Sequence, residues 1–320
     1  MTVMFTEKII FDALPAAEIK VGELATKLRI RNHKLLLAAL LRLKRKGAVS
    51  IRKPFLSQER VLKILNEYPN PKCRTISVIN LKGGVGKTIT TVNLAACLAQ
   101  LGKKTLIVDL DPQSNATLMM KTQAKPTVYD LLIGDQDGTS AVHKTIYPNL
   151  DIIPSEINLA GAEAELMRPE GVSRLRETLD AVRGNYDFIL IDCPPSLSLL
   201  TMNALVASDS IIVPVQCDQY ALPSLDMLDQ TRNTTLKVNP DLHIEGILIS
   251  AFEPTKMLCN EVLALVQQKY GDYIYETIIQ RDETLSEAAA KNMPIIHYKS
   301  DSSAAQAYMK IAQEVASNGG

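Results

Sequence analysis

The stretch Val78-Ile79-Asn80-Leu81-Lys82-Gly83-Gly84-Val85-Gly86-Lys87-Thr88 decides the fold of this chain. It continues an apolar, β-branched run over 75–79 and leads into an Ala/Leu-rich segment over 92–101, which predicts a strand, a glycine-rich turn and a helix. In such an arrangement the glycines let backbone N–H groups converge on a polyphosphate, and the helix N-terminus adds positive partial charge. The stretch therefore predicts a phosphate-binding loop in an α/β protein.

The residue types in this loop suggest individual roles. Lys87 is expected to reach the outer phosphates, and the Thr88 hydroxyl is expected to ligate Mg²⁺. The loop departs from the general pattern in two places, because Leu81 replaces the usual first glycine and a second lysine, Lys82, stands at the entrance. The expected nucleotide cradle consists of Gly83, Gly84, Val85, Gly86, Lys87, Thr88 and Ile89.

The composition is that of a globular protein, with 46% hydrophobic and 22% charged residues among 320, a length that favours about two domains. The five cysteines are scattered, which favours reduced, buried thiols over disulfides or metal ligands. The N-terminus lacks an apolar signal core, and no window approaches the ~20 apolar residues of a membrane span. We therefore expect a cytoplasmic protein.

The net charge of zero conceals an asymmetry. Residues 1–70 hold 14 Lys and Arg against 6 Asp and Glu, and the remaining 250 residues hold 21 against 29. A basic block with a net charge of +8 on an acidic body suggests that the two parts meet different partners. We predict domains at 1–68 and 75–320, joined by a linker at 69–74 that contains Pro69-Asn70-Pro71.

The basic block resembles a winged helix-turn-helix. Helices are expected at 7–14, 21–28 and 33–46, an extended segment at 48–53 and a further helix at 58–68. Such a domain would lay its third helix in the DNA major groove. The candidate phosphate contacts are Arg29, Arg31, Lys34, Arg42, Lys44, Arg45 and Arg52. Two alternatives stay open: the domain binds protein or only dimerises, and the Lys44-Arg45-Lys46 run caps a helix C-terminus.

From residue 75 onward, short apolar strands alternate with helical stretches. Strands are expected at 75–80, 104–110, 150–154, 186–192, 210–216, 244–252 and 273–279. Helices are expected at 88–101, 127–133, 156–167, 173–183, 198–207, 223–237, 257–270, 283–291 and 302–317. Continuous apolar strands such as 188–191 belong to a parallel sheet whose two faces are both covered by helices. The predicted fold is therefore a mostly parallel phosphate-loop NTPase sheet.

Acidic and polar residues follow three of these strands. Asp109 and Asp111 lie where the strand at 104–110 runs out, and Asp192 ends the strand at 186–192. In parallel sheets the ligand binds beyond the carboxyl ends of the strands, at the same rim as the phosphate loop. An Asp at such a strand end commonly holds the water shell of Mg²⁺. The strand at 210–216 ends in another polar tip, Gln216-Cys217-Asp218-Gln219.

These motifs, taken together, resemble the ParA/MinD family of deviant Walker ATPases. The resemblance rests on Lys82-Gly83-Gly84-Val85-Gly86-Lys87-Thr88, Asp109-Leu110-Asp111-Pro112-Gln113-Ser114-Asn115-Ala116-Thr117, Ile191-Asp192-Cys193-Pro194-Pro195 and Pro214-Val215-Gln216-Cys217-Asp218. Leu285-Ser286-Glu287-Ala288 and Pro294-Ile295-Ile296-His297-Tyr298 are similar to the family's C-terminal signature. The similarity covers about 75–316 and is greatest to the DNA-partitioning ParA branch, which sometimes carries an N-terminal helix-turn-helix.

The resemblance implies ATP and Mg²⁺ as cofactors and assigns roles in hydrolysis. Lys87 would bind the phosphates, with Thr88 and Asp192 on the metal, Asp109 supporting the metal side and Asp111 orienting the attacking water. Activity of such ATPases is weak until a partner stimulates it.

The resemblance also implies that Lys82 reaches across a homodimer interface to the ATP of the partner subunit. The sequence offers no obvious arginine finger in cis, and hydrolysis needs positive charge on the transferring phosphoryl group. ATP-bound dimers of the family coat DNA without sequence preference, and a ParB-like adaptor triggers hydrolysis and release. A nucleoid-associated location follows.

The family's DNA-binding residues are only partly present. Arg281 matches one family arginine, whereas the other falls on Thr284 and the usual preceding proline is Gln280. The segment 251–256 lacks the usual Arg-Thr pair, so the surface is expected to rely on Lys256, Lys291, Lys299 and Lys310.

Other functions are weaker or remain open. The nearly neutral tail disfavours a MinD-like membrane anchor, and the cysteine spacing disfavours a nitrogenase-type iron protein. An ATP-switched transcriptional regulator that uses residues 1–70 stays open, as does a ParA-like positioner of a protein cargo on the nucleoid. The sequence does not distinguish between a plasmid, a chromosome and a protein assembly as the cargo.

Overall fold

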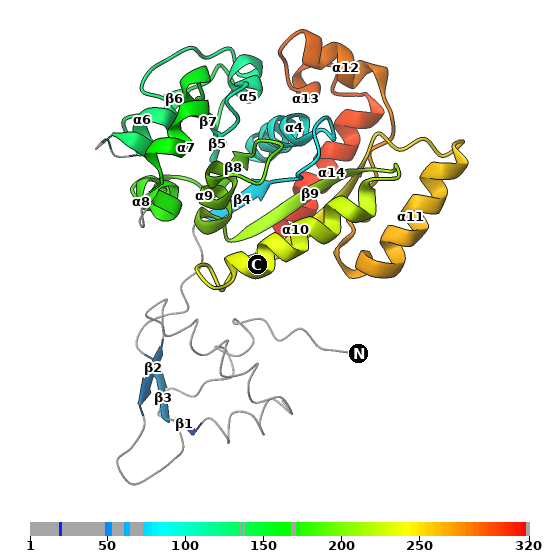
Figure 1. Cartoon of the computed structure of the whole chain (residues 1–320). Helices are drawn as coiled ribbons and strands as arrows, with labels where there is room; N and C mark the ends of the chain where they lie inside the picture. Colours follow the sequence, from blue (N-terminus) through cyan, green and yellow to red (C-terminus); the bar gives the residue numbers. More distant parts are fainter. Residues whose placement is uncertain are drawn as a thin grey trace. The chain divides into compact units, whose positions relative to one another are not determined.

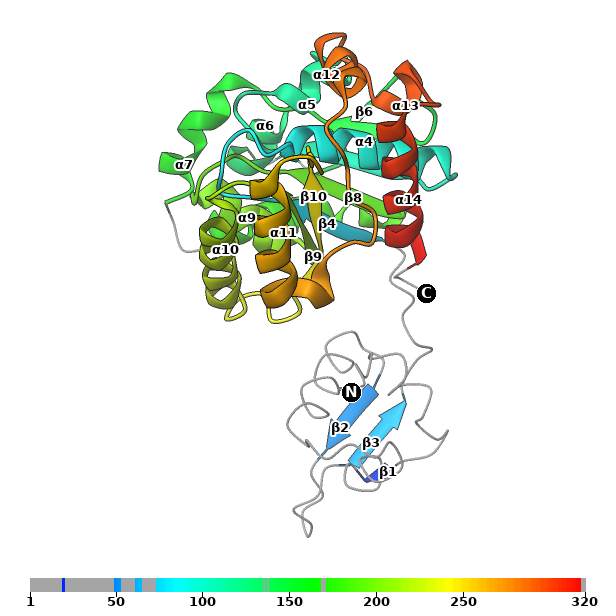
Figure 2. The ribbon, with the colours of Figure 1, turned by 90° about the vertical axis from the view of Figure 1, so that its right-hand side faces the viewer.

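The computed structural model describes residues 73–134, 136, 138–167 and 171–317, together with three short strands in the first 71 residues. The chain divides into two compact units, Met1–Pro71 and Lys72–Gly320. The larger unit is a layered α/β structure in which helices lie on both sides of one sheet (Figures 1 and 2).

The sheet of the larger unit has the strand order β10-β9-β4-β8-β5-β7-β6. Neighbouring strands are parallel except for the outer pair β6 and β7, which is antiparallel. The strands are β4 (Arg74–Val78), β5 (Thr105–Asp109), β6 (His143–Lys144), β7 (Leu150–Ile153), β8 (Phe188–Asp192), β9 (Ser210–Gln216) and β10 (His243–Ser250). The predicted, mostly parallel sheet is therefore confirmed.

Helices connect these strands. They are α4 (Lys87–Gln100), α5 (Asn115–Met119), α6 (Val128–Ile133), α7 (Ala162–Glu165), α8 (Arg174–Asp180), α9 (Leu199–Ala207), α10 (Ala221–Thr235), α11 (Met257–Tyr270), α12 (Glu283–Ala290), α13 (Ile295–Tyr298) and α14 (Ser303–Ser317). Short 3-10 turns lie at Ile157–Gly161, Gly171–Ser173, Arg183–Asn185 and Gly271–Tyr273. Among the described residues, no helix combines the length and apolarity that a bilayer crossing requires.

The central strands are apolar throughout because both of their faces are buried. In β5, Leu106 and Val108 belong to one hydrophobic cluster, which includes residues of α9, α10 and α11. Ile107 points the other way, into a second cluster with α4 and α14. Since side chains alternate along a strand, a strand between two helical layers needs apolar residues at successive positions. This requirement explains the continuous apolar runs that identify the strands in the sequence.

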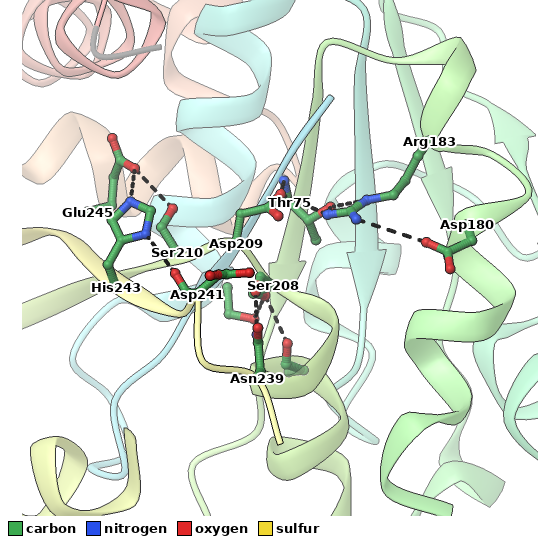
Figure 3. A network of polar contacts seen from close by, with 12 residues as sticks. Thr75, Asp180, Arg183, Ser208, Asp209, Ser210, Asn239, Asp241, His243 and Glu245 are labelled. Atoms are coloured by element: carbon green, nitrogen blue, oxygen red, sulfur yellow. Dashed lines mark hydrogen bonds and ion pairs between the residues drawn. The ribbon is translucent and has the colours of Figure 1, made fainter. Parts of the chain in front are cut away.

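A polar network joins the amino-terminal ends of the strands, on the side of the sheet away from the phosphate loop (Figure 3). Arg183 donates to the Thr75 hydroxyl at 2.9 Å and pairs with Asp209 at 2.7 Å. Arg74, the first residue of β4, pairs at 2.5 Å with Glu245, whose side chain is only 3% exposed. The network satisfies polar groups at the starts of β4, β9 and β10, which stabilises the strand order at this end.

Two of the predicted elements in the larger unit are wrong. No strand forms at 273–279. The N–H groups of Tyr275 and Ile279 donate to the carbonyl oxygens of Ile247 and Ile249. Four residues of the segment therefore cover the length of two residues in β10, which prevents regular pairing. The segment has only two isolated bridges, one from Ile274 to Ile247 of β10 and one from Gln280 to Phe252, just after β10. The helix predicted at 156–167 is reduced to a 3-10 turn and the one-turn α7. The helices α5 and α13 and the strand β6 were not predicted.

In the smaller unit the structure describes β1 (Ile19–Lys20), β2 (Val49–Arg52) and β3 (Val61–Ile64), in the antiparallel order β1-β3-β2. β2 confirms the extended segment predicted at 48–53. The helix predicted at 58–68 is wrong where β3 pairs with β2, because a short apolar run alone does not distinguish a strand from a helix. The helices predicted at 7–14, 21–28 and 33–46 lie outside the described residues, so the winged-helix assignment stays a prediction.

Candidate phosphate-binding site

The loop between β4 and α4 has the backbone conformation that its glycines allow. Gly84 and Gly86 adopt φ values of 76° and 92°, in the left-handed region that residues with a Cβ rarely enter. Gly86 is the residue before α4, whose first turn contains Lys87 and Thr88. The predicted cradle residues are therefore contiguous here: Gly83 and Gly84 are exposed, Gly86, Thr88 and Ile89 are half-buried, and Val85 and Lys87 are buried.

Lys87 is folded back over the loop. Its Nζ atom donates to the carbonyl oxygen of Lys82 at 2.9 Å. Burial lowers the pKa of Lys87, whereas the negative charges of Asp192 and Asp111 oppose this shift. The loop thus encloses a cation whose environment favours an added negative group.

Side chains from two other strands hold the loop's carbonyl groups. The Gln216 amide at the end of β9 donates to the Gly84 oxygen at 2.9 Å. The Ser250 hydroxyl at the end of β10 donates to the Val85 oxygen at 3.1 Å. These two bonds fix the backbone of the loop at Gly84 and Val85.

Asp109 is fully buried, and both of its carboxylate oxygens accept hydrogen bonds. Oδ2 accepts from the Thr117 N–H at 2.8 Å and the Thr117 hydroxyl at 2.7 Å, and Oδ1 accepts from the Asp111 N–H at 3.2 Å. Burial raises the pKa of Asp109 to about 6 although the hydrogen bonds from Thr117 lower it. Asp109 therefore ties the loop after β5 to the start of α5.

Asp192 lies next to Asp109 in the sheet register and is also fully buried. Its Oδ1 atom accepts from the Thr91 hydroxyl at 3.1 Å, whereas its buried Oδ2 atom has no hydrogen-bond partner. Burial and the charge of Asp109 raise the pKa of Asp192 well above its usual value, and the Thr88 hydroxyl acts in the opposite direction. An orphaned carboxylate oxygen beside Thr88 fits a hard divalent cation such as Mg²⁺, which prefers oxygen ligands.

Asp111 is only 7% exposed, at the same rim of the sheet. Its Oδ1 atom accepts from the Gln113 N–H at 2.9 Å, and its backbone oxygen accepts from the Ser155 hydroxyl at 2.8 Å. These contacts fix the orientation of the Asp111 carboxylate.

Lys82 is held by the residues that follow β9. Its ammonium group forms an ion pair with Asp218 and lies 5.5 Å from the centroid of the Tyr220 ring. Its N–H donates to Asn80 Oδ1 at 2.9 Å, and the Asn80 amide donates to the Pro214 oxygen at 2.9 Å. The entrance of the loop is thereby joined to the end of β9 through both backbone and side chain.

A cavity of about 610 Å³ opens beside the loop. Its walls are the loop and the start of α4, the ends of β9 and β10, the segment 251–259 that leads into α11, and the segment 279–289 with Tyr308. The volume lies within the range of small-molecule sites. The cavity contacts the loop at Gly84, Val85 and Gly86, whereas the predicted phosphate and metal ligands do not line it.

Of the predicted DNA contacts of the larger unit, Lys256, Arg281 and Lys291 have partners within the subunit, whereas Lys299 and Lys310 are exposed and form no ion pair with a described residue. Arg281 and Lys256 both bind the same oxygen of Glu253, at 3.0 and 2.7 Å. The Lys291 ammonium lies 5.2 Å from the centroid of the Tyr298 ring. The other candidates, Arg29, Arg31, Lys34, Arg42, Lys44 and Arg45, lie outside the described residues, and for Arg52 only the backbone is described.

Several residues of this site have contacts that the sequence did not predict. Gln216 and Asp218 lie in a motif that the sequence singled out, but their partners, Gly84 and Lys82, are more than 130 positions away. Thr117 bonds to Asp109 within one motif, eight residues apart. Ser250 carried no signal apart from its place at a strand end. The usable signal was the polar tip after β9, where Gln216 and Asp218 interrupt an apolar run.

The fold and the loop define a phosphate-loop nucleotide-binding protein. Residues 73–244 match the family model described as an AAA domain. The sporulation initiation inhibitor protein Soj of Bacillus subtilis is 47% identical over 251 residues, which are 77% of this chain and 99% of that protein. The chromosome partitioning protein ParA of Caulobacter vibrioides is 39% identical, over 76% of this chain and 94% of that protein.

Solved structures agree with this assignment. The cobyrinic acid a,c-diamide synthase of Mycobacterium smegmatis, solved with an ATP analogue and magnesium, has a TM-score of 0.66 and 32% identity, over 75% of this chain and 93% of that chain. The septum site-determining protein MinD of Pyrococcus horikoshii, solved with Mg-ADP, has a TM-score of 0.64 and 27% identity, over 78% and 98%. The chain belongs to the ParA/MinD family of Walker-type ATPases.

Proposed function

We propose that this chain is a ParA-type partition ATPase that pairs face to face over two ATP molecules, binds DNA in that state and releases it after hydrolysis. The chain is an ATPase with ATP and Mg²⁺ as its cofactors, as its family and the nucleotide-bound neighbours indicate. The observation that carries the proposal is the second lysine, Lys82, at the entrance of a phosphate loop whose own lysine is already enclosed.

The residues of the site divide the work of hydrolysis. Lys87 and the loop N–H groups bind the phosphates. Thr88 and Asp192 hold Mg²⁺. Asp109 lies behind them and does not ligate the metal directly, because both of its oxygens already accept hydrogen bonds. When bound, Mg²⁺ neutralises charge that develops on the phosphoryl oxygens. Asp111 orients the attacking water, for which its buried, fixed carboxylate is suited.

Lys82 supplies positive charge to the nucleotide of the partner subunit. A cation delivered in trans makes hydrolysis depend on dimerisation, and it makes ATP part of the interface. The dimer then presents two copies of each surface cation to DNA, which raises its affinity for a polyanion over that of the monomer. A ParB-like activator and a nucleoid-associated location belong to this proposal.

DNA binding by the full-length protein with ATP, with ADP and without nucleotide tests the proposal. Random-sequence DNA and DNA from upstream of the gene are compared at several salt concentrations. ATP-dependent binding that ignores sequence supports a partition ATPase. Nucleotide-independent binding to one site would refute it.

A second candidate function is favoured by the basic charge of residues 1–70. In this candidate the ATPase switches an N-terminal DNA-binding domain, and the protein regulates transcription. Removal of residues 1–70 should weaken DNA binding and flatten its salt dependence if this block contacts phosphates. An unchanged slope would assign the contacts to the ATPase unit.

A further inference from the structure

Lys82 and its two partners form a closed contact within one subunit. Asp218 binds the Lys82 ammonium through Oδ2 and accepts the Tyr220 N–H through Oδ1 at 2.9 Å. The Tyr220 ring lies on the same ammonium group, 5.5 Å from its centroid. The turn after β9 therefore fixes both the carboxylate and the ring against Lys82.

The contact is close enough to the surface to be exchanged. The side chains of Lys82 and Asp218 are 29% and 33% exposed, so neither is locked into the core. An ion pair at this exposure is weak, because water screens it. A single carboxylate is also a poorer partner for a lysine than a triphosphate, which carries several negative charges.

Asp218, the carboxylate that holds Lys82, also borders the cavity beside the loop. Gln216, Cys217 and Asp218 line it together with Gly84 and Gly86. Gln216 is in addition hydrogen-bonded to the Gly84 carbonyl. A ligand in this cavity would therefore contact the same turn that binds Lys82.

We propose that Asp218 is a positioning residue, which holds Lys82 within its own subunit until the nucleotide of a second subunit replaces it. The proposal rests on the trans role proposed above for Lys82. Dimerisation then requires two Lys82–Asp218 pairs to open, one in each subunit. The exchange is favourable only when the second subunit brings a triphosphate, so the pair disfavours association of nucleotide-free chains.

The first test measures the availability of Lys82 without requiring a dimer. The full-length, nucleotide-free protein is labelled with an amine-acetylating reagent, and modification of each lysine is followed by peptide mass spectrometry. In Asp218→Asn the new amide still accepts the Tyr220 N–H, but the charge is lost. The labelling rate of Lys82 should rise about two- to fivefold, the factor expected for a weak ion pair.

The ion pair between helices α10 and α11 provides a matched control. Lys269 of α11 pairs with Asp226 of α10 at 2.5 Å, and Asp226→Asn removes the same type of contact. This variant should raise the labelling of Lys269 and leave Lys82 unchanged. Tyr220→Leu provides a second variant of the Lys82 contact, and it should raise Lys82 labelling as well. Equal Lys82 labelling in wild type, Asp218→Asn and Tyr220→Leu overturns the proposal.

The second test measures association with a non-hydrolysable ATP analogue by sedimentation velocity. Because two pairs open per dimer, Asp218→Asn should dimerise at a protein concentration about 4- to 25-fold lower than wild type. Faster labelling of Lys82 with an unchanged dimerisation constant would overturn the link to association. If neither protein dimerises, the trans role of Lys82 fails, and labelling still decides whether Asp218 holds it.

Discussion

Asp109 and Asp192 lie directly opposite each other on the neighbouring parallel strands β5 and β8, and solvent reaches neither side chain. Burial raises the pKa of both carboxyl groups, and the charge of Asp109 raises that of Asp192 further. Only Asp109 has hydrogen bonds to both of its oxygens. The pair is therefore costly without a cation, and Asp192 carries most of that cost.

Asp192→Asn should stabilise the nucleotide-free protein and impair its ATPase activity. The amide removes a buried charge while its oxygen still accepts from Thr91, so we expect a gain of about 1–3 kcal/mol in the free energy of unfolding. Mg²⁺-dependent hydrolysis should fall at least about tenfold. Urea denaturation in EDTA and phosphate release check the two effects. Asp151→Asn is the control, because Asp151 is buried but bonded to Lys144 and Tyr186, and its loss should destabilise.

Lys82→Ala should separate nucleotide binding from dimerisation. The substitution leaves the loop's glycines and Lys87 in place, so ATP affinity should change by less than about threefold. Dimerisation with an ATP analogue and steady-state hydrolysis should both be lost. Lys237→Ala, at an exposed lysine after α10, is the control. Normal turnover by Lys82→Ala would contradict a role in trans.

Gln216→Ala should weaken nucleotide binding by about three- to tenfold. It removes the hydrogen bond to the Gly84 carbonyl, and one such bond is worth about 1 kcal/mol. The loop would then lose part of its preorganisation without losing a phosphate ligand. Fluorescent ATP titrations measure the change, with Gln230→Ala on the exposed side of α10 as control. Equal affinity in all three proteins would mean that Gln216 does not support the loop.

Glu253→Gln should strengthen DNA binding by the ATP-bound protein. Glu253 now neutralises Lys256 and Arg281 through one oxygen, and its loss frees both cations for phosphates. The slope of log affinity against log salt should steepen by about one to two per subunit. Glu177→Gln, which removes the same charge beside Arg174, should have a smaller effect. An unaltered slope in Glu253→Gln would exclude these cations from the DNA surface.

The pair between Arg74 and Glu245 should give an acid-sensitive contribution to stability. Burial alone would raise the pKa of Glu245, but the charge and hydrogen bond of Arg74 lower it below 4.5. The contribution is therefore present above pH 4.5 and is lost as the pH falls through the folded-state pKa. Urea midpoints between pH 3 and 7 should show a shallower acid decline for Glu245→Gln than for wild type. Glu276→Gln, at an exposed glutamate, should retain the wild-type slope.

The sheet and the phosphate loop could be predicted because each has a local physical cause. The apolar runs of the central strands follow from two buried faces, as Leu106 and Ile107 illustrate. The loop has glycines at 84 and 86 because the backbone angles there are ones that only glycine adopts without strain. Such causes act within a few residues and leave a pattern in the sequence.

The contacts that complete the site could not be predicted, because they join distant residues. Lys82 and Asp218 are 136 positions apart, and Gln216 and Gly84 are 132 apart. The short helices α5 and α13 are likewise fixed by packing, since one turn is too short to be stable alone. The segment 275–279 has the composition of a strand, but its register against β10 prevents continuous pairing.

The way the sheet ends has a consequence for self-association. The segment 274–279 runs along the outer side of β10, bridged at Ile274 and bonded through the N–H groups of Tyr275 and Ile279. The opposite border, β6, is two residues long and includes Lys144. Open, lengthy strand borders recruit strands from other molecules and lead to aggregation. In the larger unit, one border of the sheet is covered and the other is short and charged, so neither offers a long open strand to a second copy of the chain.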